Sequence, residues 1–274
     1  MKNIPYLLAL HSIDGLGPIR LKAILDYFKD PKLAWEAQDK KIKSKLEPQE
    51  YAKSIKDAGI SWITLFDDSY PKLLKQIYDP PVVLYYKGEI LPQDENAIAI
   101  VGTRRMTGYG KAITDQFTQL LVGYGLTIVS GLARGVDSEA HLAALKSGGR
   151  TIAVLGGGLN QIYPPENKNL AEKIIAGFGA IISEFLPNAL SQPGNFPARN
   201  RIISGLSKAV LVTEASEDSG SLITARLALE QGREVFAVPG PITSKLSKGP
   251  IDLIKEGAKP IFNVEDILEE LQWN

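Results

Sequence analysis

Residues 97–111 read AIAIVGTRRMTGYGK, an apolar run followed by a turn rich in glycine, threonine and arginine. A run that is apolar on both faces is typical of a parallel strand covered by helices on both sides. An amphipathic helix is expected next, over 109–123. The same unit, a short β-branched run followed by a helical stretch, recurs along most of the chain, and this recurrence decides the fold.

The alternation predicts an α/β protein with an open, doubly wound, mostly parallel sheet. Two of the β-branched runs precede the first strand–helix unit, so we expect an extended Rossmann-like sheet. The expected strands are 62–66, 82–86, 97–101, 126–130, 151–155, 180–183, 209–213 and 234–238, and the expected helices are 109–123, 136–147, 167–177, 198–207, 220–231 and 264–272.

The first sixty residues carry a different, all-helical pattern, so we expect two domains, 1–60 and 61–274. IDGLGPIR (13–20) contains a Gly-x-Gly turn, and Pro18 suits the start of the next helix. This turn resembles the helix-hairpin-helix element, whose amides can approach a nucleic-acid phosphate. An ordinary connector in a small helical bundle is the alternative. The expected helices are 4–10, 18–29, 31–38 and 48–58, with lysines clustered at Lys40, Lys41, Lys43 and Lys45.

Composition excludes several classes of protein. The 274 residues include 31 basic and 31 acidic ones, so bulk attraction to nucleic acid or to acidic membranes is not expected. Cysteine is absent and His11 and His141 are the only histidines, so we expect no thiol chemistry, no metal and no cofactor. No apolar run is long enough to cross a membrane or to act as a signal peptide, which favours a cytoplasmic protein.

Polar loops follow the expected strands at their carboxyl ends, where open parallel sheets bind ligands. Their glycines, hydroxyl residues and helix starts favour an anion site. The spacing fits neither a P-loop nor the dinucleotide fingerprint, so a dinucleotide enzyme is disfavoured. These loops are GTRRMTGYGK (102–111), GLARGVDSEAH (131–141), GGGLNQIYP (156–164), EASEDSGSLITAR (214–226) and PGP (239–241).

Positive charge concentrates near these loops although the total is neutral. Residues 185–213 contain no acidic residue, and residues 102–136 contain only one, Asp115. Arginines next to Phe196 and Tyr109, whose rings can stack on bases, are typical of single-stranded nucleic-acid binding. The alternative is that these arginines pair with Asp137, Glu184 and Glu214. The basic residues concerned are Arg104, Arg105, Lys111, Arg134, Arg199, Arg201 and Lys208.

Signals for catalysis are weak. Asp137 and His141 lie four residues apart on one helix face, with Ser130, Ser138 and Ser219 as candidate nucleophiles. A nucleophile elbow is missing, and no pair of carboxylates stands out for hydrolysis. His141 lies in the apolar helix SEAHLAAL, where we expect it to be packed and hydrogen-bonded to Asp137. We therefore expect a binding protein and not an enzyme.

The loop sequences closely resemble the DprA (Smf) family of DNA-processing proteins over roughly residues 60–260. FPARNRIISG combined with SGSLITA is specific, whereas a single glycine loop would not be. The helical N-terminal segment also resembles the extra domain, SAM-like or helix-hairpin-helix-like, that is common in the family. The matching stretches are VGTRRMTGYG (101–110), SGLARGVDSEAH (130–141), VLGGGLNQIYPPEN (154–167), FPARNRIISGLS (196–207), EASEDSGSLITARLALEQGREVFAVPG (214–240) and LIKEGA (253–258).

The resemblance implies a homodimer that binds single-stranded DNA with little sequence preference. It also implies that the protein protects incoming DNA and loads the RecA recombinase onto it during natural transformation and recombination. Carried over by motif, the family's arginine of the G-[ST]-R loop falls on Arg104. The aromatic residue and the arginines of its FPxRNR segment fall on Phe196, Arg199 and Arg201, and its SGS segment falls on Ser219, Gly220 and Ser221. The full set of expected DNA-binding residues is Gly102, Thr103, Arg104, Arg105, Arg134, Phe196, Arg199, Asn200, Arg201, Ser219, Gly220 and Ser221.

Two departures from the family pattern stand out. Gly249 is followed by Pro250 where members often have Asn, which puts a polar contact there in doubt. The chain ends at Asn274, without the C-terminal winged helix of many members. The competing function is a nucleotide-binding Rossmann protein akin to nucleoside-monophosphate phosphoribohydrolases, but VPGPIT (238–243) lacks their PGGxGTxxE motif. A pure interaction scaffold is the third possibility.

The last helix, 264–272, has one apolar face on an otherwise acidic segment, and that face must be covered. Either it packs on its own domain, or it contacts a second copy of the chain or RecA. The residues of this face are Val264, Ile267, Leu268 and Leu271.

Overall fold

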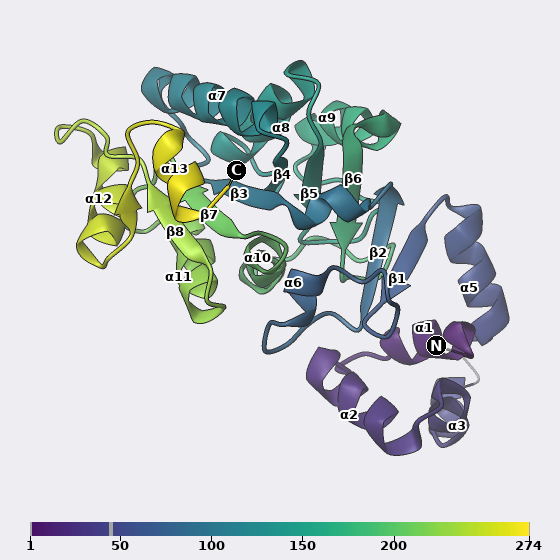
Figure 1. The fold of residues 1–274 in the computed structure, drawn as a ribbon. Helices are drawn as coiled ribbons and strands as arrows, with labels where there is room; N and C mark the ends of the chain where they lie inside the picture. Colours follow the sequence, from purple (N-terminus) through teal and green to yellow (C-terminus); the bar gives the residue numbers. More distant parts are fainter. Residues whose placement is uncertain (1, 44–45, 274) are drawn as a thin grey trace.

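The computed structural model describes residues 2–43 and 46–273 and is built around one mixed sheet. The strands lie in the order β1-β2-β6-β5-β4-β3-β7-β8-β9, and every neighbouring pair is parallel except β1–β2 and β2–β6 (Figure 1). The strands are β1 (Ser61–Thr64), β2 (Val83–Gly88), β3 (Ala97–Val101), β4 (Thr127–Ser130), β5 (Thr151–Val154), β6 (Gly179–Ser183), β7 (Ala209–Val212), β8 (Glu234–Ala237) and β9 (Lys259–Pro260).

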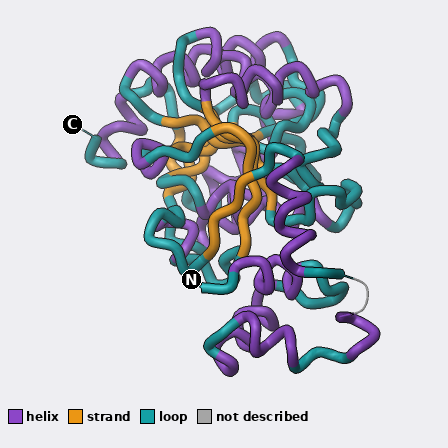
Figure 2. The backbone as a smooth tube through the Cα atoms, turned by 90° about the vertical axis from the view of Figure 1, so that its right-hand side faces the viewer, coloured by secondary structure: helices purple, strands orange, loops and turns teal. Residues whose placement is uncertain are grey.

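Helices cover both faces of this sheet. One face packs on α7, α8, α9 and α13, and the other packs on α6, α10, α11 and α12. Figure 2 shows the strands enclosed between these layers. The covering helices are α6 (Lys72–Lys75), α7 (Gly108–Gly123), α8 (Val136–Lys146), α9 (Lys168–Lys173), α10 (Asn195–Gly205), α11 (Ser221–Glu230), α12 (Lys248–Lys255) and α13 (Glu265–Glu270).

Alternate residues of β3 explain why both layers are needed. Ile98 and Ile100 point to the α7–α8 layer, while Ala97, Ala99 and Val101 point to the α10–α11 layer. All of them are buried, as expected for a central strand whose two faces both exclude water. The prediction of a doubly wound, extended Rossmann-like α/β fold is confirmed, with β1 and β2 forming the antiparallel extension at one edge.

The N-terminal segment is a cluster of short helices beside β1 and β2 (Figure 1). Leu7, Leu8 and Leu10 of its first helix are fully buried and belong to the same apolar cluster as Tyr85 of β2. A hydrogen bond of 3.1 Å between His11 Nδ1 and Tyr85 Oη also joins the segment to the sheet. The helices are α1 (Ile4–His11), α2 (Pro18–Phe28), α3 (Pro31–Glu36), α4 (Lys40–Lys43) and α5 (Pro48–Asp57).

All eight expected strands are present, with ends shifted by two residues at most. Three helices, α4, α6 and α12, and the two-residue strand β9 were not predicted. Helices α4 and α6 and strand β9 span four residues or fewer, which is too short for a periodic pattern. Helix α12 begins with Lys248, Gly249 and Pro250, and a Gly-Pro pair is more typical of a turn than of a helix. Helix α10 begins at Asn195, three residues before the expected start at 198. Pro197 is compatible with this start, since the N–H groups of a first turn have no helical acceptor. Lys45 of the lysine cluster and the terminal Asn274 lie outside the described residues.

The apolar face of α13 packs on its own domain. Val264, Ile267 and Leu268 are 2%, 0% and 8% exposed and join the cluster formed by α7, α8 and β3. Trp273 continues this contact, because its Nε1 donates to the carbonyl of Tyr124 at 3.1 Å. Of the two possibilities for this face, the structure shows the intramolecular one. Within 2–43 and 46–273, no helix is both long enough and apolar enough to span a membrane.

Candidate functional site

The loops that leave β3, β4 and β5 meet the first turn of α10 and form a small depression at the carboxyl edge of the sheet. Its volume of about 10 Å³ admits roughly one water molecule, so it cannot enclose a metabolite. Three arginines and two aromatic rings surround it. We call this feature the arginine depression, and its lining residues are Arg104, Gly131, Ala133, Arg134, Gly156, Tyr163, Pro164, Phe196 and Arg199.

Arg199 forms the floor of the arginine depression and is 4% exposed. Its Nη1 donates to the carbonyl of Gly131 at 2.6 Å and to that of Val154, and its Nε donates to Asn200 Oδ1 at 3.2 Å. A Cβ on Gly131 would lie 2.6 Å from the guanidinium nitrogens, so this approach requires glycine. The guanidinium therefore ties together the loops after β4 and β5.

One end of the Arg199 guanidinium remains accessible. Nη2 has no hydrogen-bond acceptor in the described part of the chain, and it is not fully buried. Burial lowers the pKa of Arg199 to about 10, with the Asp137 carboxylate opposing the shift. The side chain is thus still cationic at neutral pH, and Nη2 can donate to an anion in the depression.

Phe196, Arg104 and Tyr163 form a stacked group above this floor. The Cζ atom of Arg104 lies 5.5 Å from the centroid of the Phe196 ring, within the range of a cation–π contact. The Tyr163 ring lies 5.8 Å from the Phe196 ring at 42°. A Cβ on Gly156 would lie 2.8 Å from Phe196 Cδ1, so the ring can occupy this position because residue 156 has no side chain. The group places two aromatic rings, tilted relative to each other, beside positive charge.

Arg134 completes the rim through a labile contact. It pairs with Glu166, and the two side chains are 54% and 49% exposed. Solvent screens an ion pair this exposed, so it contributes little to stability. Arg134 can therefore exchange its carboxylate partner for another anion at little cost.

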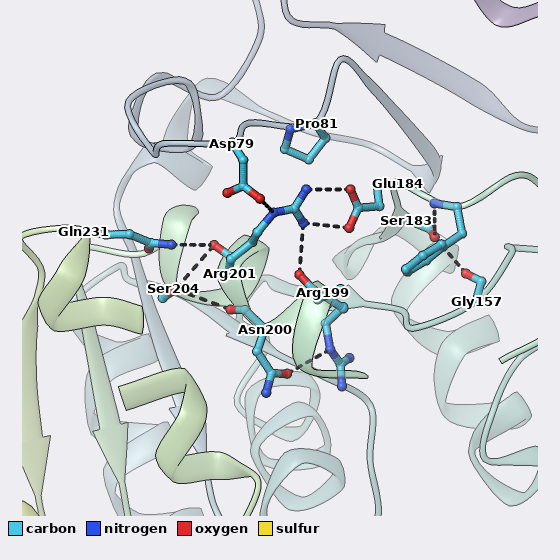
Figure 3. Close-up of polar contacts among 12 residues, drawn as sticks. Asp79, Pro81, Gly157, Ser183, Glu184, Arg199, Asn200, Arg201, Ser204 and Gln231 are labelled. Atoms are coloured by element: carbon cyan, nitrogen blue, oxygen red, sulfur yellow. Dashed lines mark hydrogen bonds and ion pairs between the residues drawn. The ribbon is translucent and has the colours of Figure 1, made fainter. Parts of the chain in front are cut away.

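Arg201 does not face the depression, contrary to the sequence prediction of a phosphate contact. Arg199 and Arg201 point to opposite sides of α10 (Figure 3). Arg201 is 8% exposed, and its Nε donates to Asp79 at 2.8 Å while Nη1 and Nη2 each donate to Glu184 at 2.6 Å. The carboxylates raise the pKa of Arg201 against the effect of burial. The alternative pairing with Glu184 is what the structure shows, and the side chain clamps α10 to β6 and to the segment before β2.

Glu214 has a comparable internal role. Its carboxylate accepts from the N–H of Thr107 at 2.9 Å and from the Thr107 hydroxyl at 2.6 Å. The Thr107 hydroxyl in turn accepts from the N–H of Gly110 at 3.1 Å, which caps α7. Thr107 and Glu214 thus hold the N-terminus of α7, and the Thr107 hydroxyl occupies the amide of Gly110. Glu214 pairs with Thr107 and not with an arginine.

The remaining candidates hold the loops in position. Thr103 donates its N–H to the carbonyl of Glu214 at 2.7 Å and accepts from the N–H of Val136 at 3.1 Å. A Cβ on Gly102 would lie 2.6 Å from that same Glu214 carbonyl. The side chain of Arg105 is exposed at the surface, while its backbone N–H donates to Thr103 Oγ1 at 3.2 Å.

Residues 219–221 form the start of α11 and do not line the depression. The hydroxyls of Ser219 and Ser221 are hydrogen-bonded at 2.8 Å. Asn200 Nδ2 donates to the carbonyl of Gly220 at 3.3 Å, so Asn200 links this turn to Arg199. Within the turn, the N–H of Ser219 donates to the carbonyl of Ser216 at 3.0 Å and the N–H of Ser221 donates to Ser219 Oγ at 3.4 Å.

Tyr109, which we expect from the sequence to stack on a base, lies outside the arginine depression. Tyr109 donates its hydroxyl to the carbonyl of Pro239 at 3.2 Å and is not part of the depression. Tyr163 stacks on Phe196 instead and is 44% exposed. Tyr163 lies in the loop directly after β5, and the other lining residues also come from strand-end loops or from α10. This position is the sequence signal that identifies Tyr163 as a candidate.

Asp137 and His141 are buried and do not form an acid–base pair. Asp137 accepts from the N–H groups of Gly131 and Ala133 at 3.1 and 3.4 Å, and burial raises its pKa. His141 is packed as expected, but its Nδ1 lies 2.6 Å from the hydroxyl of Thr151 and not against Asp137. Burial lowers the pKa of His141 to about 3, so it is neutral. Within the described ranges, no cluster of acidic and histidine side chains is arranged to hold a metal ion.

A family model described as DNA recombination-mediator protein A matches residues 61–272. DNA processing protein DprA of Bacillus subtilis is 50% identical over 80% of this chain and 73% of its own length. Protein Smf of Synechocystis sp. is 40% identical over 97% of this chain and 72% of its own length.

Two solved structures extend the comparison. The X-ray structure of DNA processing protein A from Streptococcus pneumoniae is similar with a TM-score of 0.87 and 37% identity, over 98% of this chain and 99% of that one. A structure of DNA processing protein A from Helicobacter pylori, described for its single-stranded DNA binding mode, has a TM-score of 0.68 and 34% identity, over 77% and 96% of the two chains.

We predict that Arg201→Gln lowers the free energy of unfolding by about 3 kcal/mol, because two carboxylates then lose the charge that they share in a largely buried place. Urea denaturation followed by circular dichroism measures this loss. Arg226→Gln, at an exposed position on α11, is the matched control and should change the free energy by less than about 0.5 kcal/mol. Equal stability of the two variants would contradict the clamp.

Proposed function

The chain belongs to the DNA recombination-mediator protein A family, and on that premise we propose that it binds single-stranded DNA, with little sequence preference, at the arginine depression. The observation that carries this proposal is the stacked group of Arg104, Phe196 and Tyr163 above the buried guanidinium of Arg199. An aromatic ring accepts the π-face of any base, and the arginines beside it neutralise phosphates.

Each residue has a distinct role in this proposal. Arg104, Arg134 and Nη2 of Arg199 contact phosphates, while Phe196 and Tyr163 stack on bases. Arg105 adds positive charge at the rim. Gly102, Thr103 and Asn200 set the shape of the loops. The hydroxyls of Ser219 and Ser221, at the start of α11, contact a further phosphate. Arg201 has no contact with DNA and fixes the position of α10.

This role is binding and not catalysis. The buried, neutral His141 and the buried Asp137 support it, since neither can reach a substrate at the surface. The neutral net charge is compatible with DNA binding, because the positive charge that matters is collected at one edge of the sheet.

Arg104→Ala should weaken binding of labelled oligo-dT by about tenfold, since one phosphate contact and one cation–π contact are lost. The slope of log affinity against log salt should fall by about 0.7. Fluorescence anisotropy over a series of salt concentrations measures both. Arg226→Ala, which removes an exposed arginine outside the depression, should leave both unchanged. An Arg104→Ala variant with unaltered affinity and slope would overturn the site assignment.

The proposal includes a recombination role in the cytoplasm. As the family resemblance implies, the chain protects incoming DNA and loads the RecA recombinase onto it during natural transformation. With single-stranded DNA already covered by a single-strand-binding protein, RecA hydrolyses ATP only after a lag. Adding the chain should shorten this lag, and Arg104→Ala should restore it. A lag that the wild-type chain leaves unchanged would contradict RecA loading.

The proposal also includes a homodimer formed through the sheet domain. Two apolar side chains near the β8–β9 end, Ile242 and Phe262, are 91% and 76% exposed and would be buried by a second copy. Phe262→Glu should then convert the dimer to a monomer in light scattering. Tyr27→Glu, an equally exposed aromatic position on α2, should leave the dimer intact. A monomeric wild-type chain, or a dimer that survives Phe262→Glu, would contradict this interface.

A further inference from the structure

A second concave feature lies beside the arginine depression and is much larger. It is a groove of about 810 Å³ between the N-terminal helices and the loops that leave β5 and β6. Trp35, Ile42 and Tyr51 line the helical wall, and Asn160, Leu186 and Asn188 line the wall on the sheet side. We call it the interdomain groove. Its walls are largely apolar: Trp35 belongs to the apolar cluster of the N-terminal helices and is 5% exposed, while Ile42, Tyr51 and Leu186 pack on that cluster and are partly exposed.

The interdomain groove and the arginine depression share one loop. Asn160 lies in the groove and Tyr163 lies in the depression, three residues further along the same chain segment. Three residues of extended chain span at most about 11 Å, so the two sites are close neighbours. The loop after β6 joins them a second time, because it runs from Leu186 in the groove to Phe196 in the depression. A strand bound at the depression therefore has the groove within reach.

The chemistry of the groove suits bases better than phosphates. Its walls are apolar and aromatic, and Asp14 is the single ionisable acid among its lining residues. Two amides are held at the rim in fixed orientation, since Asn160 Nδ2 donates to Asn188 Oδ1 at 2.8 Å and Lys87 Nζ donates to Asn160 Oδ1 at 3.4 Å. Bases combine an aromatic face with neutral hydrogen-bonding edges, which such walls can hold.

Positive charge borders the groove on the helical side. Helix α4 carries Lys40, Lys41 and Lys43 around Ile42, which lines the groove. Lys87, which bonds to the rim, adds a cation from β2. Cations around an apolar interior are complementary to a strand whose phosphates face outward and whose bases face inward.

We propose that the interdomain groove holds the bases of the nucleotides next to those at the arginine depression, so that the N-terminal helices lengthen the bound segment of single-stranded DNA. This inference rests on the proposed function of the depression. It gives the helical segment a role in binding through its groove wall and α4, and not through the Gly-x-Gly turn itself.

The test compares affinity for oligo-dT of increasing length, from about four to about twenty nucleotides. Affinity of the wild-type chain should rise with length and then level off. Ile42→Glu places a carboxylate in the groove and should weaken binding of the longest oligonucleotides by about tenfold, since stacking of one base contributes about 1–3 kcal/mol. Binding of the shortest ones should be unchanged. Leu33→Glu, an exposed position on α3 outside the groove, is the matched control and should behave as wild type.

The outcomes separate the two proposals. Arg104→Ala should weaken short and long oligonucleotides alike, and its failure to do so would overturn the depression as the primary site. Ile42→Glu with a wild-type dependence on length, or Leu33→Glu with the same loss, would overturn the groove proposal alone. Photo-crosslinking of 5-iodo-deoxyuridine oligonucleotides gives an independent readout. Long oligonucleotides should crosslink to Trp35 or Tyr51, and crosslinks confined to Tyr163 and Phe196 at every length would contradict the groove.

Discussion

The buried guanidinium of Arg199 is the contact on which the carboxyl edge of the sheet depends. It bonds to the carbonyls of Gly131 and Val154, so one cation fixes the ends of β4 and β5 against the first turn of α10. A buried charge is tolerated only where polar groups surround it, and here two carbonyls, the Asn200 amide and the nearby Asp137 carboxylate do so. This arrangement requires glycine at position 131, because any side chain there would displace the guanidinium.

Two further internal contacts keep the same edge rigid. Glu214 holds the loop after β3 through Thr107, and Arg201 holds the far side of α10 through Asp79 and Glu184. These contacts leave Arg104, Arg134, Phe196 and Tyr163 on a fixed frame with their functional faces outward. A preformed surface loses little conformational entropy when a flexible strand binds to it. The interdomain groove is joined to this surface by the loops after β5 and β6. In our proposal it holds the neighbouring nucleotides on an equally preformed surface.

The fold could be predicted from the sequence because the strands form recognisable runs that are apolar on both faces, as in AIAIV at 97–101. The site followed only in part. The strand-end loops predicted where a ligand would bind, and the structure brings Arg104, Arg134, Phe196 and Arg199 together at that edge. The sequence pattern does not show which way a helical side chain points, and Arg201, two residues after Arg199, lies on the opposite side of α10. Nor does it show that Glu214 closes the N-terminus of α7, or that Tyr163 and not Tyr109 meets Phe196, since these pairs are far apart along the chain.

A crystal structure of the chain bound to a short oligo-dT tests the central claim most directly. The account predicts a phosphate within hydrogen-bonding distance of Arg104 and of Nη2 of Arg199, with a thymine stacked on Phe196 or Tyr163 and Arg201 still bonded to Glu184. A strand bound elsewhere on the molecule, with the arginine depression unoccupied by DNA, would contradict it.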